Sequence, residues 1–143
     1  MHILNRYKSY IQQRLPKEVA KAWSKHLLSG KFRQIQRRMY SPDQDAFCCL
    51  GVLAYKTYEV PLNILESIQT ICVSDKYVND ETFDLFNSEF IPLTREDQLT
   101  YFGFTKDTLC ISLNGIFAFA NDRDALSFQQ IGTFLNTLHD EHT

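Results

Sequence analysis

The chain of 143 residues has no long apolar run and little glycine, proline or cysteine. No stretch approaches the roughly 18 consecutive apolar residues of a membrane-spanning helix, so we expect no membrane insertion. Five glycines and four prolines are too few for a long flexible linker. An apolar content of 44% provides enough core-forming residues, and we predict a single globular domain over residues 1–143.

A secretion signal is also missing, because basic residues interrupt the start of the chain. We therefore expect the protein to act in a cytoplasm, with its thiols reduced. Its four cysteines are the adjacent pair Cys48 and Cys49 and the isolated Cys72 and Cys110. No Cys-x-x-Cys or His-x-x-x-His pair provides metal-ligand spacing, so we predict neither a metal nor a cofactor.

Acidic residues are nearly absent from the first 40 positions. This third of the chain holds ten Lys or Arg residues and one acid, Glu18, whereas residues 41–143 hold five basic residues and sixteen acids. Such an asymmetry fits an anionic partner for one face, or attraction between oppositely charged parts of the fold. The candidate partner- or nucleic-acid-binding side chains in this basic third are Lys17, Lys21, Lys25, Arg33, Arg37 and Arg38.

Two helices and a strand are predicted in the same third. One helix covers residues 3–14, and a second runs from about 16 to 29. The second helix has an apolar stripe, and its lysines fall on the opposite face. The stripe is Val19, Trp23 and Leu27, and the lysines are Lys17, Lys21 and Lys25. Gly30 ends this helix, and residues 32–39 suggest a short edge strand.

The most apolar segment, residues 46–58, predicts a buried central helix. Gly51 in its middle predicts a closely packed neighbour. Cys48 or Cys49 near the helix start could be a hydrolase nucleophile, because a helix dipole lowers a thiol's pKa. However, no histidine lies in a predicted strand after this helix to act as the base. The preferred interpretation is a buried core pair, and we predict no catalytic residue.

Helix signals continue through the second half of the chain. Residues 61–72 show helical spacing, and Asp80 suggests the start of a short helix ending near residue 86. Thr94 has the position of an N-cap for a helix that ends at Gly103. A final helix starts at the capping box of Ser127 and ends near residue 139.

Residues 109–120 predict a β-hairpin. Asn114-Gly115, the dipeptide typical of a type I′ turn, separates two apolar runs there. The fold class is therefore α+β: a helix-dominated single domain packed on a small antiparallel sheet, with a C-terminal β-hairpin followed by a helix. Asn121 and Asp122 follow the hairpin as a candidate partner contact, and an Asx-type turn leading to Ser127 is the simpler interpretation.

Three blocks carry a resemblance to known proteins. They are Trp23 with Ser29-Gly30-Lys31-Phe32-x-Gln34, then Phe47-Cys48-Cys49-Leu50-Gly51-Val52-Leu53, then Asn121-Asp122 followed by Ser127-Phe128-x-x-Ile131. Together they resemble a family of small, mostly uncharacterised proteins of bacteriophages and prophages. Members of that family usually have a glycine between the last two pairs, where this chain has Arg123-Asp124-Ala125-Leu126. The resemblance brings no reaction with it and implies a phage accessory protein acting in a bacterial cytoplasm.

We therefore expect a non-enzymatic binding protein of phage origin. It would occupy a host protein or an anti-phage defence component, as an inhibitor or by sequestration. One alternative is nucleic-acid binding through the basic N-terminal third. The other is a cysteine hydrolase that uses Cys48 or Cys49.

Overall fold

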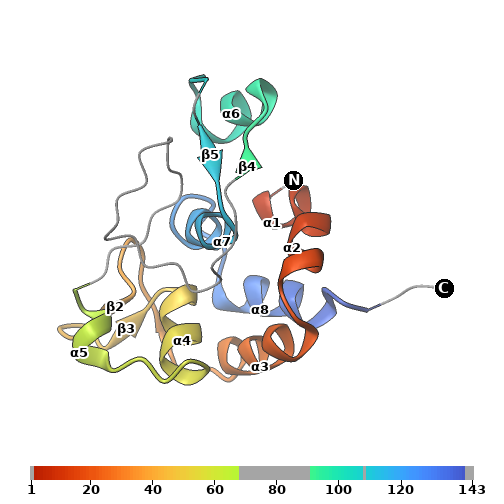
Figure 1. The fold of residues 1–143 in the computed structure, drawn as a ribbon. Coiled ribbons are helices and arrows are strands. Elements are labelled where there is room, and N and C mark those ends of the chain that lie inside the picture. Colours follow the sequence, from red (N-terminus) through yellow and green to blue (C-terminus); the bar gives the residue numbers. More distant parts are fainter. Residues whose placement is uncertain (1, 68–90, 108, 141–143) are drawn as a thin grey trace.

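A computed structural model describes residues 2–67, 91–107 and 109–140 (Figure 1). The helix predicted to begin at Asp80, and the part of the 61–72 helix beyond residue 67, lie outside these ranges. The helices are α1 (Ile3–Arg6), α2 (Lys8–Arg14), α3 (Lys17–Leu28), α4 (Cys49–Lys56), α5 (Leu62–Leu65), α6 (Arg95–Phe102), α7 (Leu113–Asp122) and α8 (Phe128–Thr137). The strands are β1 (Arg33–Gln34), β2 (Tyr40–Ser41), β3 (Ala46–Phe47), β4 (Ile91–Pro92) and β5 (Cys110–Ile111).

The strands form two small sheets, and the helix-dominated α+β class is confirmed. One sheet has the order β1-β3-β2, with β1 parallel and β2 antiparallel to β3. The other is the antiparallel pair β4-β5. The first sheet is therefore mixed rather than purely antiparallel. β1 is one of its two edge strands, but it covers only Arg33–Gln34 of the strand predicted over residues 32–39.

The N-terminal helices differ from prediction in one place. Residues 3–14 form two helices, because the backbone leaves helical geometry at Tyr7. At this break Arg6 Nε and the Tyr7 hydroxyl both donate to the buried carboxylate of Asp97, at 3.0 and 2.8 Å. The break thus anchors the N-terminus to α6. The α3 helix follows prediction, and Gly30 leaves it with a φ of 76°, in the left-handed region that glycine favours.

The central helix begins later than predicted. Ala46 and Phe47 belong to β3, and α4 starts at Cys49 with Cys48 as its N-cap. The Cys48 sulfur accepts from Gly51 N at 3.3 Å. The close neighbour predicted at Gly51 is present, since a Cβ there would overlap the Met39 carbonyl oxygen and lie 2.8 Å from its carbon. Glycine is therefore required where the helix crosses the backbone of residue 39.

The predicted hairpin over residues 109–120 is wrong. Strand geometry is limited to Cys110–Ile111, and the segment after it is the helix α7. Ser112 caps this helix, its Oγ accepting from Gly115 N at 3.1 Å, so Asn114-Gly115 lies in a first helical turn. Every residue of α7 before Asp122 is buried. A short apolar run buried on all sides has no distinguishing period, which explains why the turn-forming dipeptide misled the prediction.

The last helix lies along α3 (Figure 1). Both halves of the predicted capping box are present at Ser127, and the α6 cap at Thr94 is confirmed as well. Ser24 Oγ donates to Gly132 O at 2.7 Å where α3 meets α8. In the core beside this contact, the Trp23 and Phe117 rings lie 4.6 Å apart. No helix within the described ranges is long and apolar enough to cross a bilayer.

Candidate binding site: a groove beside a buried polar junction

Asn121 is the centre of a buried hydrogen-bond network. Its Oδ1 accepts from the backbone N–H of Cys49 at 3.1 Å and from Gln34 Nε2 at 2.8 Å. Its Nδ2 donates to Ile35 O at 2.9 Å and to Asp122 Oδ1 at 2.8 Å. Two acceptor lone pairs and two donors are the full capacity of an asparagine amide, and this buried side chain uses all of it.

Two neighbours extend this network. Gln34 Nε2 also donates to Leu126 O at 2.8 Å, and Gln34 Oε1 accepts from Phe128 N, the first N–H of α8, at 3.1 Å. Asp122 Oδ1 also accepts from Arg37 N at 2.9 Å. We call Gln34, Asn121 and Asp122 the polar junction. It fastens β1, α4, α7 and the start of α8 to one another.

The polar junction changes the interpretation of Asn121 and Asp122. The Asx-type turn is wrong, because both residues belong to the last turn of α7. Asn121 is buried and Asp122 is half-buried, so their amide and carboxylate act inside the protein. The three sequence blocks quoted above meet here, because these bonds join Gln34, Cys49, Asn121 and Phe128. Trp23 of the first block joins them by donating from Nε1 to Cys49 O at 2.9 Å.

The two adjacent cysteines lie in the same interior. Cys48 and Cys49 are buried, and burial raises the pKa of Cys48 to about 12 and that of Cys49 well above its ordinary value. The bond from Gly51 N opposes this rise at Cys48 but is the smaller effect. Cys49 Sγ donates to Phe117 O at 3.4 Å. Desolvation thus outweighs the helix N-terminus, which favours the core interpretation over a thiolate nucleophile.

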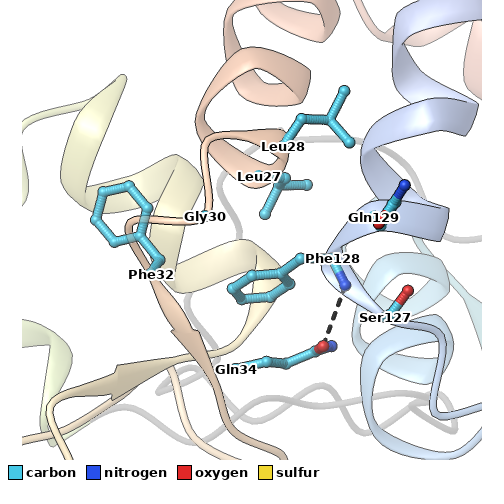
Figure 2. Close-up of a pocket in the computed structure, with 8 residues that line it drawn as sticks. All are labelled: Leu27, Leu28, Gly30, Phe32, Gln34, Ser127, Phe128 and Gln129. Carbon is cyan, nitrogen blue, oxygen red and sulfur yellow. Dashed lines mark hydrogen bonds between the residues drawn. The ribbon is translucent and has the colours of Figure 1, made fainter.

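A groove opens next to the polar junction, with a volume of about 540 Å³ (Figure 2). It lies between the C-terminal end of α3, the segment from Gly30 to Gln34 that leads into β1, and the N-terminus of α8. Figure 2 shows Gln34 along one side, hydrogen-bonded to Phe128, with the leucines on α3 across from it. The lining residues are Leu27, Leu28, Gly30, Phe32, Gln34, Ser127, Phe128 and Gln129.

Apolar side chains reach solvent in this groove. Leu28 is 43% exposed and Phe32 is half-buried, whereas Leu27 and Phe128 are buried beneath them. At Gly30 an added Cβ would meet no heavy atom within 4 Å, so the backbone itself faces open space. The groove thus combines an apolar base with exposed backbone at Gly30.

Three lysines lie around His26, whose ring contacts the groove residue Phe32. The His26 ring meets the Phe32 ring edge-on at 6.4 Å. Burial lowers the pKa of His26, and the nearby charges of Lys56, Lys25 and Lys31 lower it further. We call these three lysines the basic rim. Within the described ranges the ammonium groups of Lys25 and Lys31 have no hydrogen-bond or ion-pair partner.

Neither segment that forms a wall of the groove contains a carboxylate that could neutralise these lysines. The chain has no Asp or Glu from Val19 to Pro42, the segment that contains the end of α3 and β1. It has none from Ala125 to His139 either, the segment that contains α8. The positive charge of the basic rim is therefore not neutralised along the groove walls.

The six predicted basic residues have different partners and surroundings. Lys21 donates to the Asn136 carbonyl and pairs with Asp140 at 3.5 Å, near the far end of α8. Arg38 donates to Glu66 O at 3.1 Å. Lys25 belongs to the basic rim, whereas Arg37 contributes its backbone to the polar junction. The exposed side chains of Lys17 and Arg33 lie outside the groove lining. Some of the basic side chains in the N-terminal third are therefore bonded to other groups of the protein rather than free for a partner.

Sequence inspection missed most groove residues. Leu28 falls outside the predicted apolar stripe of α3, and Ser127 is predicted only as a helix cap. Nearly 100 positions separate the two walls, so only folding brings them together. The one available signal was the lack of acids between Glu18 and Asp43.

Comparisons of the chain with protein-family models, with curated proteins and with solved structures found no match.

Proposed function

We propose that the chain is a non-enzymatic binding protein and that the groove is its binding surface. Its partner would be a protein of the bacterial host or of an anti-phage defence system, met in the cytoplasm and inhibited or sequestered by occupation. The observation that carries the proposal is the exposed apolar groove, open at Leu28 and Phe32 and bordered by the basic rim. The resemblance to phage proteins supports the biological setting.

The physical basis is the mixture of apolar area and charge in one place. Burying apolar surface contributes roughly 25 cal/mol per Å², so covering the groove lining would stabilise a complex. Charged residues around an apolar centre steer association and select partners more than they add affinity. Interfaces commonly have this arrangement of a small buried centre and a polar rim.

Site-specific photo-crosslinking in bacteria tests the proposal. A photoreactive amino acid would replace Gln129, which lines the groove, or Gln13, an exposed glutamine of α2 outside it. We expect a discrete crosslinked product from position 129 and none of the same mass from position 13. Equal products at both positions, or no product at position 129, would contradict the proposal.

Nucleic-acid binding remains a second candidate because residues 19–42 carry six Lys or Arg side chains and no acid. Neutralising phosphates releases counterions, so such binding would weaken steeply as salt rises. Fluorescence anisotropy of a labelled oligonucleotide at two salt concentrations is the test. Binding independent of salt, or no binding at low salt, would eliminate this candidate.

A further inference from the structure

The groove indicates what kind of partner segment it binds, an inference that rests on the proposed function. We infer that it takes an acidic, extended segment of a partner protein, with one apolar side chain flanked by Asp or Glu. The apolar side chain would lie against Leu28, Phe32 and Phe128, and the carboxylates would approach Lys25 and Lys31.

The apolar centre follows from the lining. Leu27, Leu28 and Phe128 present hydrocarbon, and a volume of about 540 Å³ is within the roughly 300–1,000 Å³ typical of ligand pockets. A purely polar occupant would leave Leu28, which is 43% exposed, without a matching surface. One leucine or phenylalanine side chain with its adjoining backbone matches this groove in chemistry.

The acidic flanks follow from the charges. Lys31 lies between the lining residues Gly30 and Phe32, and Lys25 lies one helical turn before Leu28 on α3. No carboxylate occurs in either segment that forms the walls. A basic partner segment would therefore be repelled, and a neutral one would leave the lysine charges uncompensated. Charge complementarity thus selects an acidic occupant.

The extended conformation follows from β1. This two-residue strand is one edge of its sheet, and among the described residues no strand pairs with its outer side. Phe32, just before the strand, and Gln34, its last residue, are two positions apart and both line the groove. A partner segment lying beside β1 would place every second side chain in the groove, as in other complexes that extend a sheet edge.

A nucleic acid fits the groove less well. Base stacking needs an aromatic face open to solvent. The half-buried Phe32 ring already meets the edges or faces of two rings, His26 at 6.4 Å and Phe47 at 5.4 Å. The remaining walls at Leu27 and Leu28 are aliphatic.

The test uses the full-length protein labelled with ¹⁵N and pools of synthetic peptides of roughly eight residues. Each peptide in the first pool has one Leu or Phe flanked by Asp and Glu. A second pool replaces the acids with Asn and Gln, and a third replaces the apolar residue with Ser. A single-stranded thymidine oligonucleotide and the protein alone at increasing concentration complete the set.

We expect the first pool, at a concentration of about 1 mM, to shift the amide signals of Gly30, Phe32 and Gln129. The same pool should raise the pKa of His26, because bound carboxylates oppose the lysine charges that lower it. The other two pools should bind at least about tenfold more weakly. Salt should weaken the first pool's binding but not abolish it.

Several results would overturn the inference. They are no shift at the groove with the first pool, equal shifts with the neutral pool, stronger shifts with the oligonucleotide, or shifts on concentrating the protein alone, which would indicate a second copy. If crosslinking at position 129 succeeds while the peptides fail, the binding function stands and only the partner chemistry is wrong. If crosslinking fails while the peptides bind, the groove has its chemistry but not the proposed partner.

Discussion

Gln34 lies between two regions that differ in how far their side chains are buried and bonded within the protein. On one side, the polar junction buries Asn121 and uses all four of its hydrogen-bonding positions. On the other side, the groove leaves Leu28 43% exposed, and the ammonium groups of Lys25 and Lys31 on its rim have no hydrogen-bond or ion-pair partner among the described residues. The Asn121 amide has no hydrogen-bonding position left for a ligand, whereas the groove still has exposed apolar surface that a ligand could cover.

This comparison changes the meaning of the most noticeable sequence features. The adjacent cysteines and the Asn-Asp pair are the residues that suggest chemistry in the sequence, yet they lie in or beside the polar junction. The groove is formed by ordinary leucines, phenylalanines and a glutamine. A residue type that often carries function is therefore a weaker guide than whether its bonding capacity is already used.

We expect the largest loss of stability from substitution of Gly51. Gly51→Ala would place a methyl group against the Met39 carbonyl, and backbone cannot yield as a flexible side chain can. We expect the free energy of unfolding to fall by about 4 kcal/mol or more, or the chain not to fold at all. Urea denaturation followed by circular dichroism measures this loss.

Gly30→Ala is the matched control for Gly51. An added Cβ at Gly30 has open space, and the cost is limited to its left-handed φ of 76°. We expect a loss of about 1 kcal/mol. Equal losses at the two glycines would show that the contact with Met39 is not the constraint.

Substitution in the polar junction should also lower the free energy of unfolding substantially, although less than at Gly51. Asn121→Ala removes the acceptor for Cys49 N and Gln34 Nε2 and the donor to Ile35 O. Each buried group left without a partner costs about 1–3 kcal/mol, so we expect a loss of about 3 kcal/mol or more. Urea denaturation again provides the measurement. Asn63→Ala, at an exposed position of α5, should change stability by less than about 0.5 kcal/mol.

The cysteines give a prediction about pH. Burial holds the pKa of Cys48 near 12, whereas the unfolded thiol has a pKa of about 8.5. The unfolded state therefore loses this proton first, and the stability that the buried neutral thiol contributes is lost as pH rises from about 8.5 toward 12. Cys48→Ala should show a smaller loss of stability over this interval than the wild-type protein does.

Thiol labelling tests the same burial at neutral pH. The half-buried Cys110 should react with a small alkylating reagent faster than Cys48 and Cys49, with each site read by mass spectrometry. Rapid labelling of either buried cysteine in the native protein would reopen the hydrolase alternative.

How much of this fold the sequence predicts depends on whether the signal is local. The caps at Thr94 and Ser127 and the close approach at Gly51 were predictable, because each depends on residues within one turn or on the lack of a side chain. The helix α7 was not, because Asn114-Gly115 has a strong local turn preference that burial overrides. The groove was not predictable either, since its walls are distant in sequence.

A small gain in stability is expected at Ala125. This residue adopts a φ of 50° just after α7, where Leu126 N donates to Ala120 O at 2.9 Å. Glycine adopts this left-handed conformation with little strain, which outweighs its greater freedom in the unfolded chain. Ala125→Gly should therefore raise the free energy of unfolding by about 0.5–1 kcal/mol. A loss of stability would mean that the alanine methyl makes contacts worth more than the strain.

Substitution of Gln129 should change the stability of the protein least and its binding to the partner most clearly. Gln129→Glu places a carboxylate in the groove, while a negative charge in the first turn of α8 favours the helix dipole. The melting temperature should therefore stay the same or rise slightly. Affinity for the partner crosslinked at position 129 should nevertheless fall, because an acidic segment is repelled.

Comparing the dissociation constants of Gln129→Glu and Gln13→Glu for that partner tests the central claim most directly. Both variants add the same charge to an exposed glutamine, but only one of these residues lines the groove. The groove account predicts at least about tenfold weaker binding for Gln129→Glu and no change for Gln13→Glu. Equal affinities for the two variants would contradict it and place the binding surface elsewhere on the protein.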